Sequence, residues 1–350
     1  MKVLYAIQGT GNGHLSRAAE VIPILKNYCN LDVMVSGRQT SIDLPYPVTY
    51  QFGGLGFTFG NNGGIDLWET FNEARLLRLK QEYASLPVKQ YDLVINDFEP
   101  VSAWACQLQK VPCIALSHQS ALLEPEVPLL PGQDFLGKFV LKYYAPSYDR
   151  IGFHFESYNP RIYTPVIRKG VRMQKPFDKG HFTVYLPAYD PHKLASYLET
   201  VKGIKWEIFG RVPSKQQWNN DVSIYPIGNE SFTQSMVNSR GVLCGAGFET
   251  PAEALFLGKK LLVVPMKGQY EQQSNAFALN QLGVQSISSV KPESIGEIRE
   301  WTERDDAPQM DYPDQTQQII KEIFNRFEVV KDSIGVMQGT RSSIHSVSDF

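Results

Sequence analysis

The sequence lacks the features that mark several large classes of protein. None of its apolar runs reaches the roughly 18 residues that suggest a membrane-spanning helix, and the opening MKVLYAI is too short for a secretory signal. With 34 basic and 36 acidic residues the net charge is −2, so there is no basic excess to bind nucleic acid. The four cysteines form no C-x-x-C pair, which favours buried reduced thiols over disulfides or zinc. We therefore expect a cytoplasmic enzyme.

The composition is that of a globular protein long enough for two domains. Hydrophobic residues make up 43% of the 350 and charged residues 20%, so each half can bury its own core. Short apolar runs recur along the chain and predict an α/β fold, with buried strands separated by helices. The predicted strands are 2–7, 32–35, 91–95, 111–116 and 151–155 in the first half, and 182–186, 206–209, 222–225, 241–244 and 261–265 in the second.

The stretch from Val242 to Ala276 carries the strongest local pattern. A buried strand is followed by two glycines that permit a tight turn, then by a helix and a second strand. Thr250 is the predicted N-cap of that helix, and Glu253 closes a T-x-x-E capping box. Such a helix start favours a phosphate, because its free N–H groups and its positive end point toward the ligand.

Polar residues gather just after the second of these strands. They are Glu271, Gln272, Gln273 and Asn275, and ligands of parallel sheets bind beyond the carboxyl ends of the strands. A simpler interpretation is that Glu253 only caps its helix and that EQQSNA is a solvated helix face. We favour a ligand site, because both clusters fall at strand ends of one βαβ unit.

The first predicted strand leads into a glycine loop, Gly9-Thr10-Gly11-Asn12-Gly13-His14, and then into a helix. This order again favours a phosphate or a close backbone approach. The dinucleotide fingerprint G-x-G-x-x-G fails, because its third position is His14. The second strand ends without the acid that holds an NAD ribose, although Arg38 would suit a 2′-phosphate. A Rossmann-type oxidoreductase or nucleotide-binding protein therefore remains an alternative.

Two more polar side chains follow predicted strands. Asp97 comes after strand 91–95 and His118 after strand 111–116, so both are expected at the same rim. For His118, packing within a loop is the other interpretation. Farther along, residues 128–148 mix aromatic residues with Lys138 and Lys142. That pattern fits core packing or a weak contact with a membrane surface.

Three of these motifs carry a resemblance to a known family. The run GFETPAE at 247–253 is similar to the G-x-N-S/T-x-x-E block of nucleotide-sugar glycosyltransferases with the GT-B fold. The run EQQSNA at 271–276 resembles their D/E-Q-x-x-N-A block, and the first loop resembles their G-x-G-H loop, with Asn12 as an extra residue. The family includes UDP-glycosyltransferases and the lipid-carrier N-acetylglucosaminyltransferase of peptidoglycan synthesis.

The resemblance implies two Rossmann-like doubly wound domains that face each other across a cleft. The acceptor-side domain would span 1–165, and the nucleotide-sugar domain would span 181–312. Residues 166–180 would link them, a C-terminal helix at 313–328 would cross back to the first domain, and 329–350 would form a polar tail. Residues 163–168 resemble the passage that ends the first domain in the peptidoglycan enzyme.

The resemblance also implies roles for single residues. Glu253 would hold the donor ribose, and Glu271 with Gln272 would contact the donor sugar. His14 would take the proton of the acceptor hydroxyl, and Asp97 would either orient His14 or act as the base itself. Further donor-side candidates are Gly11, Gly13, Arg168, Arg211, Ile227, Gly247, Phe248 and Thr250, and His118 is the acceptor-side candidate.

The implied function is inverting transfer of a sugar from a nucleotide donor, expected to be UDP-linked, to a hydroxyl group. The nucleotide sugar is a co-substrate, and neither a cofactor nor a metal is expected. The acceptor would be a saccharide or a lipid-linked molecule, with a weak peripheral contact of 128–148 with the inner face of the membrane in the second case. A sugar-nucleotide 2-epimerase of the same fold is the main alternative.

Overall fold

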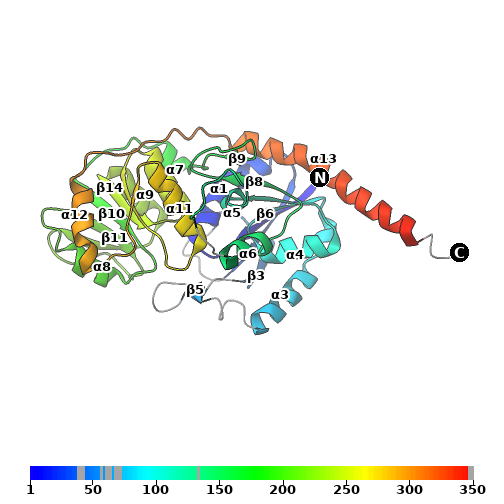
Figure 1. The fold of residues 1–350 in the computed structure, drawn as a ribbon, viewed down its shortest axis with the longest axis horizontal. Helices are drawn as coiled ribbons and strands as arrows, with labels where there is room; N and C mark the ends of the chain where they lie inside the picture. The colour runs from blue at the N-terminus through cyan, green and yellow to red at the C-terminus, as the bar shows by residue number, and fades with distance from the viewer. Residues whose placement is uncertain (38–43, 56–57, 60–64, 67–72, 132–134, 346–350) are drawn as a thin grey trace.

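The computed structural model describes the chain except residues 38–43, 56–57, 60–64, 67–72, 132–134 and 346–350. Two seven-stranded sheets lie in the two halves of an elongated molecule (Figure 1). The first sheet has the order β3-β2-β1-β6-β7-β8-β9, and all its strands are parallel. Its strands are β1 Lys2–Gln8, β2 Asn30–Ser36, β3 Tyr50–Phe52, β6 Leu93–Asp97, β7 Cys113–Ser117, β8 Asp149–Phe153 and β9 Ile162–Tyr163.

The second sheet has the order β12-β13-β11-β10-β14-β15-β16, with only β12 antiparallel to its neighbour. A two-stranded ribbon, β4 Thr58–Phe59 with β5 Ile65–Asp66, stands apart from both sheets. The strands of the second sheet are β10 His181–Tyr185, β11 Lys205–Gly210, β12 Gln216–Gln217, β13 Val222–Pro226, β14 Gly241–Gly245, β15 Lys260–Val264 and β16 Gln285–Ser286.

Helices connect the strands of each sheet. In the first half they are α1 Asn12–Leu25, α3 Glu73–Ser85, α4 Pro100–Gln109, α5 His118–Ala121 and α6 Phe135–Tyr143, with the short 3-10 helix η1 Val88–Gln90. Later in the chain they are α7 Lys169–Arg172, α8 Pro191–Leu198, α9 Asn229–Asn238, α10 Glu249–Phe256, α11 Tyr270–Gln281, η2 Pro292–Ser294, α12 Ile295–Glu303 and α13 Thr316–His345.

The central strands are apolar throughout because both of their faces are covered. In β1, Val3, Tyr5 and Ile7 belong to one hydrophobic core, while Leu4 and Ala6 belong to another on the opposite face. Successive side chains of a strand point to opposite faces, so a strand covered on both sides is a continuous apolar run. This is why the sequence alone predicted the position of β1.

The order of the strands fixes where loops can form a site. In the first sheet the chain moves from β1 to β2 on one side and later to β6 on the other, so the strand order reverses between β1 and β6. The second sheet reverses in the same way between β10 and β14. Ligands of doubly wound sheets bind at such points, beyond the carboxyl ends of the strands. The loops that follow β1, β6 and β14 therefore lie where a site is expected.

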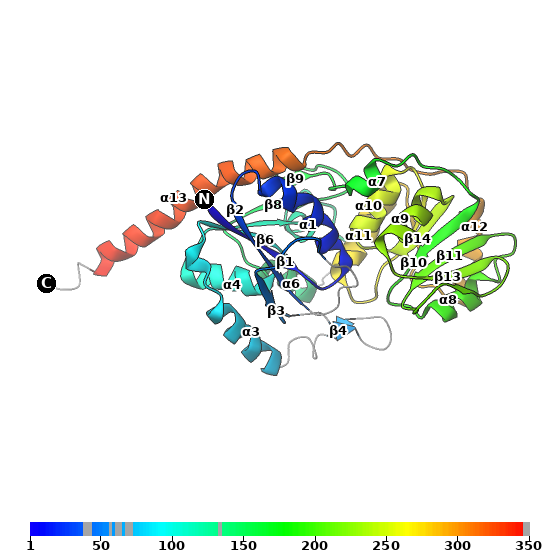
Figure 2. The ribbon, with the colours of Figure 1, turned by 180° about the vertical axis from the view of Figure 1, so that it is seen from behind.

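The last helix returns to the first half of the molecule. Figures 1 and 2 both show α13 lying along that half and projecting beyond it. Ile319, Ile320 and Ile323 are buried in the core that also contains α1. The sequence prediction placed a polar tail from residue 329, whereas α13 continues to His345. In the described part of the chain, no helix is long and apolar enough to cross a membrane.

The start of α10 differs from the sequence prediction. The helix begins at Glu249 after Phe248, so Thr250 lies inside it and is not the N-cap. No side chain caps this end of α10, and the carboxylate of Glu253 binds Arg168 instead of closing a capping box. Gly258 follows the end of this helix with a φ of 62°, the left-handed conformation at which many helices stop.

Candidate functional site

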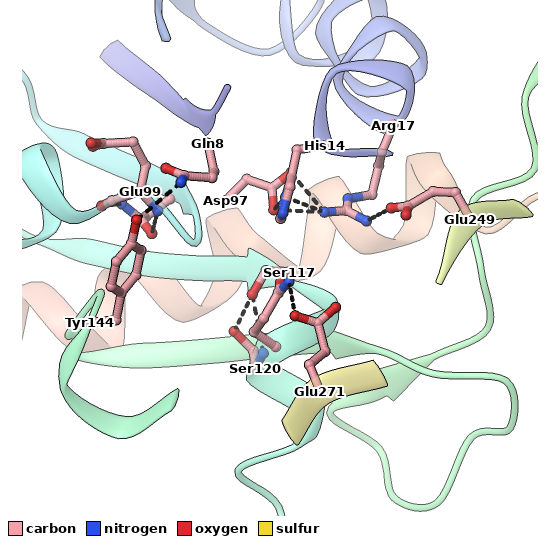
Figure 3. Close-up of polar contacts among 12 residues, drawn as sticks. Gln8, His14, Arg17, Asp97, Glu99, Ser117, Ser120, Tyr144, Glu249 and Glu271 are labelled. Carbon is pink, nitrogen blue, oxygen red and sulfur yellow. Dashed lines mark hydrogen bonds and ion pairs between the residues drawn. The ribbon is translucent and has the colours of Figure 1, made fainter. Parts of the chain in front are cut away.

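His14 and Asp97 meet where the first sheet reverses its order. β1 and β6 are paired with Ile7 opposite Asp97, so Asp97 stands at the carboxyl end of β6 beside the loop that follows β1. Gly11 takes a φ of 90° in that loop, and α1 begins directly after it. This turn brings His14 Nδ1 to 2.7 Å from Asp97 Oδ1 (Figure 3). Asp97 is fully buried, while 14% of the His14 side chain is exposed.

Arg17 completes this cluster, and the sequence analysis missed it. Residues three apart share a helix face, so Arg17 lies beside His14 on α1. Its Nη2 group donates to both carboxylate oxygens of Asp97, at 2.6 and 2.8 Å, and lies 3.1 Å from His14 Nδ1. Its Nη1 group donates to Glu249 at the start of α10. The spacing G-H-x-x-R was the signal that could have revealed it.

The charges of this cluster oppose the effect of burial. Burial raises the pKa of Asp97, but Arg17 and His14 lower it more, so the net shift is downward. Burial lowers the pKa of His14, but Asp97 raises it more, and the net shift is upward. Asp97 is therefore anionic at neutral pH and accepts a hydrogen bond from His14 Nδ1–H. A proton can then be taken up by the imidazole only at Nε2.

Helix α10 carries two acidic residues, and each forms an ion pair with an arginine from outside the second half. Glu249 binds Arg17 of α1, and a Cβ atom at Gly13 would overlap the Glu249 carboxylate. Glu253, one turn later, forms a two-pronged pair with Arg168, from Nε to Oε1 and from Nη2 to Oε2, both 2.6 Å. The first turn of α10 therefore lies at the junction of the two halves, as Figure 2 shows for α1, α7 and α10.

The predicted sugar-binding pair lies on α11. Glu271 Oε2 accepts a hydrogen bond of 3.0 Å from Gln119 Nε2 of the first half. Gln272 Oε1 accepts one of 3.0 Å from the backbone N–H of Met266. Both side chains are half-buried, so each keeps some surface for a ligand. Figure 3 shows Glu271 below the His14–Arg17 cluster.

His118 follows β7 directly, where the sequence placed it, but its ring is not open to a ligand. It is buried, and both of its ring nitrogens are occupied: Nδ1 lies 2.8 Å from the carbonyl oxygen of Phe153, and Nε2 lies 2.7 Å from Asn275 Oδ1. Its ring stacks on Phe248, with centroids 4.1 Å apart. His118 therefore joins the two halves and has no open face for an acceptor, which favours the packing interpretation.

The remaining donor-side candidates lie after strands of the second sheet. Arg211 follows β11 and is exposed, Ile227 follows β13 and is half-buried, and Gly247 follows β14. Tyr185, at the end of β10, accepts a hydrogen bond of 3.2 Å from Asn12 Nδ2 of the first loop. The carboxyl ends of the second sheet thus face the first glycine loop.

Asp97 and Glu99 are only two residues apart, but their carboxylates bind different partners and do not form one site. Glu99 caps α4, accepting 2.7 Å hydrogen bonds from the N–H groups of Val101 and Ser102 and one of 2.5 Å from Ser36. The carboxylate of Asp97 binds His14 and Arg17 instead. Within the described residues, no three His, Cys, Asp or Glu side chains lie close enough to hold a metal ion.

Comparisons with known proteins place the chain in a family and identify its fold. Residues 1–298 match the family model described as glycosyl transferase family 1. UGT2 of Phytolacca americana, solved with UDP-2-fluoro-glucose and pterostilbene, aligns with a TM-score of 0.57 and 15% identity over 92% of this chain and 93% of its own. A UDP-glucosyltransferase from Polygonum tinctorium aligns with a TM-score of 0.56 and 14% identity over 93% and 98%.

A third likeness is to UGT89C1 of Arabidopsis thaliana, solved with quercetin. Its TM-score is 0.55 at 10% identity, over 96% of this chain and 99% of its own. At such low identity these likenesses show the fold, which is GT-B with two Rossmann-like halves. No curated protein matches the sequence significantly.

Proposed function

The chain belongs to glycosyl transferase family 1, and from this premise we propose that it transfers a sugar from a UDP-linked donor to a hydroxyl acceptor with inversion and without a bound metal. That it is a glycosyltransferase of the nucleotide-sugar type follows from its family and fold. UDP is favoured because two of the similar structures carry UDP in their names, one as a bound UDP-sugar.

The contact between His14 and Asp97 is the observation that carries this proposal. With Nδ1–H held 2.7 Å from Asp97 Oδ1, the lone pair of Nε2 is available to take the proton of the acceptor hydroxyl. The acceptor oxygen then attacks the anomeric carbon, and the bonding electrons leave with the nucleoside diphosphate. We assign the base role to His14 and an orienting role to Asp97, because Asp97 is fully buried and already accepts from Arg17.

The donor would lie against the start of α10 and the carboxyl ends of the second sheet. Free N–H groups at a helix start stabilise a diphosphate, and fixed hydrogen-bond donors around a leaving group typically contribute more to catalysis than the base does. Glu253 would hold the ribose hydroxyls and Arg168 would stabilise the diphosphate, so the pair that they form with each other must open or be shared. Glu271 and Gln272 would contact the sugar.

For the acceptor we propose a saccharide or a lipid-linked hydroxyl compound. The lipid-linked case is supported by α6, where Lys138, Phe139, Lys142 and Tyr143 are exposed together. Aromatic side chains beside lysines fit the interface of an anionic membrane. The protein would then be cytoplasmic, with α6 in peripheral contact with the inner face of the membrane.

The test compares wild type with His14→Ala. A thermal-shift screen first identifies the nucleotide sugar that binds, and UDP release is then followed with acceptor mixtures. We expect His14→Ala to retain donor affinity and to lose about 10²–10⁴-fold in turnover, while His192→Ala at an exposed site retains full activity. Turnover of His14→Ala within a few-fold of wild type would remove His14 as the base.

A further inference from the structure

We propose that Arg17 is a positioning residue that holds the His14–Asp97 pair in its working state and links that pair to helix α10 of the other half. The inference rests on the proposed role of His14 as the base. Arg17 contacts four groups at once: both oxygens of Asp97, the ring of His14 and the carboxylate of Glu249.

The surroundings of Arg17 fix its guanidinium in place. Only 2% of its side chain is exposed, and its guanidinium carbon lies 5.3 Å from the centroid of the Phe153 ring. Two hydrogen bonds to the two oxygens of one carboxylate define the plane of Asp97. Because that plane decides where Oδ1 meets His14 Nδ1, Arg17 sets the direction in which the imidazole points.

The charge balance gives Arg17 a second effect. Arg17 is permanently cationic, so it offsets the charge of Asp97 whether or not His14 is protonated. Without Arg17, the buried carboxylate would face His14 alone, and the imidazole would take up a proton to balance it. A protonated imidazole cannot act as a base. Arg17 thus lowers the proton affinity of His14 and favours the neutral imidazole, which is the form that can act as a base.

Glu249 extends this effect to the donor side. It lies in the first turn of α10, the same helix that presents Glu253 one turn later, and its carboxylate lies so close to α1 that a Cβ atom at Gly13 would force it to move. A shift of α10 relative to α1 therefore changes the strength of the ion pair between Glu249 and Arg17. It thereby changes how strongly Arg17 interacts with Asp97 and His14. The position of the donor helix is in this way transmitted to the base.

The charged groups around His14 come from three elements: Asp97 on β6, Arg17 on α1 and Glu249 on α10. Tyr5 on β1 lies beside these three groups. The pKa of the Tyr5 phenol is raised well above its usual value, chiefly by burial, so Tyr5 stays neutral. Asp97 and Glu249 raise the pKa of His14 and Arg17 lowers it, so removing Arg17 and removing Glu249 must act in opposite directions.

The experiment is an NMR titration of the His14 imidazole in the full-length, ligand-free protein. The His14 signal is assigned by its loss in His14→Gln. We expect Arg17→Gln to raise the pKa of His14 by about one unit or more, which is at least a tenfold gain in proton affinity. Glu249→Gln should lower it, and Arg299→Gln at an exposed site of α12 should leave it unchanged.

Arg17→Lys separates charge from geometry. It keeps the positive charge but cannot reach Asp97 and Glu249 with two separate nitrogens, so the pKa of His14 should stay near that of wild type while kcat falls and KM for the donor changes little. Arg17→Lys also provides a second test of the proposal if the Arg17→Gln variant does not fold. An unchanged or lowered pKa of His14 in Arg17→Gln, or an unchanged pKa in Glu249→Gln, would overturn the proposal.

These titrations need no turnover, so they fail or succeed independently of the proposed function. If His14→Ala remains active while the two opposite shifts are observed, the base assignment is wrong and the electrostatic link stands. If His14→Ala is inactive and neither shift is observed, the base assignment stands and the role of Arg17 is overturned. Repeating the titration with UDP bound shows whether donor binding changes the pKa of His14 through Glu249.

Discussion

At the scale of single residues, the pair of Glu253 and Arg168 decides how a donor can bind. Glu253 is 3% exposed and both of its oxygens are held by one guanidinium. Burial lowers the pKa of Arg168 but Glu253 raises it more, so the net shift is upward and Arg168 stays cationic. A ribose that binds Glu253 must therefore share this carboxylate with Arg168 or displace it.

We expect Glu253→Gln to weaken UDP binding. A hydrogen bond to a charged group contributes about 1.5–3 kcal/mol, which corresponds to a loss of about tenfold or more in affinity. Isothermal titration calorimetry with UDP measures it, with Glu300→Gln at an exposed site of α12 as the matched control. Equal UDP affinity in Glu253→Gln and wild type would mean that the carboxylate only anchors Arg168.

His154 makes the stability of the protein sensitive to acid. It is buried, and neither ring nitrogen has a hydrogen-bond partner among the residues described. Burial lowers the pKa of His154 well below 6.5, and His118 lowers it further. The unfolded chain thus binds this proton more readily than the native protein. The associated stability is fully present above the unfolded pKa and is lost as the pH falls below it.

His154→Phe should remove this sensitivity. Phenylalanine has a similar shape and suits the aromatic neighbours Phe155 and Tyr158, and it leaves no buried polar atom without a partner. Urea unfolding at about pH 5.5 should show a larger gain over wild type than unfolding at about pH 8. His192→Phe at an exposed site is the control. An equal gain at both pH values would contradict the titration argument.

At the scale of elements, the strands were predictable and the start of α10 was not. The central strands are buried on both faces, so their apolar runs are visible in the sequence whatever surrounds them. The capping pattern at Thr250 and Glu253 failed because Arg168, 85 positions earlier, takes the Glu253 carboxylate. No local pattern contains that contact. His14 and Asp97 could be predicted because each follows a strand in the sequence. Arg17 could not, because its role depends on contacts with residues that are distant in the sequence.

Helix α6 is the element on which the membrane proposal depends. Its outer surface combines two lysines, Lys138 and Lys142, with Phe139 and Tyr143, which are 59% and 44% exposed. Two lysines near an anionic surface contribute about 1 kcal/mol each, so we expect weak binding that salt abolishes.

Flotation with liposomes containing phosphatidylserine tests this. The double variant Lys138→Glu, Lys142→Glu should lose the association seen with wild type, whereas Lys193→Glu, Lys202→Glu on the second half should retain it. If wild type does not float with the liposomes, or if the first double variant floats as well as wild type, α6 is not a membrane contact.

At the scale of the whole molecule, the two halves meet through polar contacts concentrated at the carboxyl ends of both sheets. These contacts are Arg17 with Glu249, Arg168 with Glu253, Gln119 with Glu271, His118 with Asn275 and Asn12 with Tyr185. Each joins a residue of the first half or the connecting segment to one of the second. Three of these residues, Arg168, Glu253 and Glu271, are also assigned to the donor. Donor binding and the arrangement of the halves are therefore expected to influence each other.

Helix α13 forms a second connection, away from that junction. It packs on the first half through an apolar face, and Arg326 Nη1 donates a 2.9 Å hydrogen bond to Asp149 Oδ2 of β8. Phe324 stacks on Tyr28 just after α1, with ring centroids 5.7 Å apart. The chain thus passes from the first half to the second and back again, and the first half includes a segment from beyond residue 315.

The stability of the first half should therefore depend on the apolar face of α13. Ile320 is fully buried there, and its neighbour Lys321 is exposed. Ile320→Ala should lower the free energy of unfolding by about 2–5 kcal/mol, and Lys321→Ala should change it by less than about 0.5 kcal/mol. Alanine favours helix at both sites, so helix propensity cannot explain a difference. Urea unfolding followed by circular dichroism measures both, and equal midpoints would mean that α13 is not docked on the first half in solution.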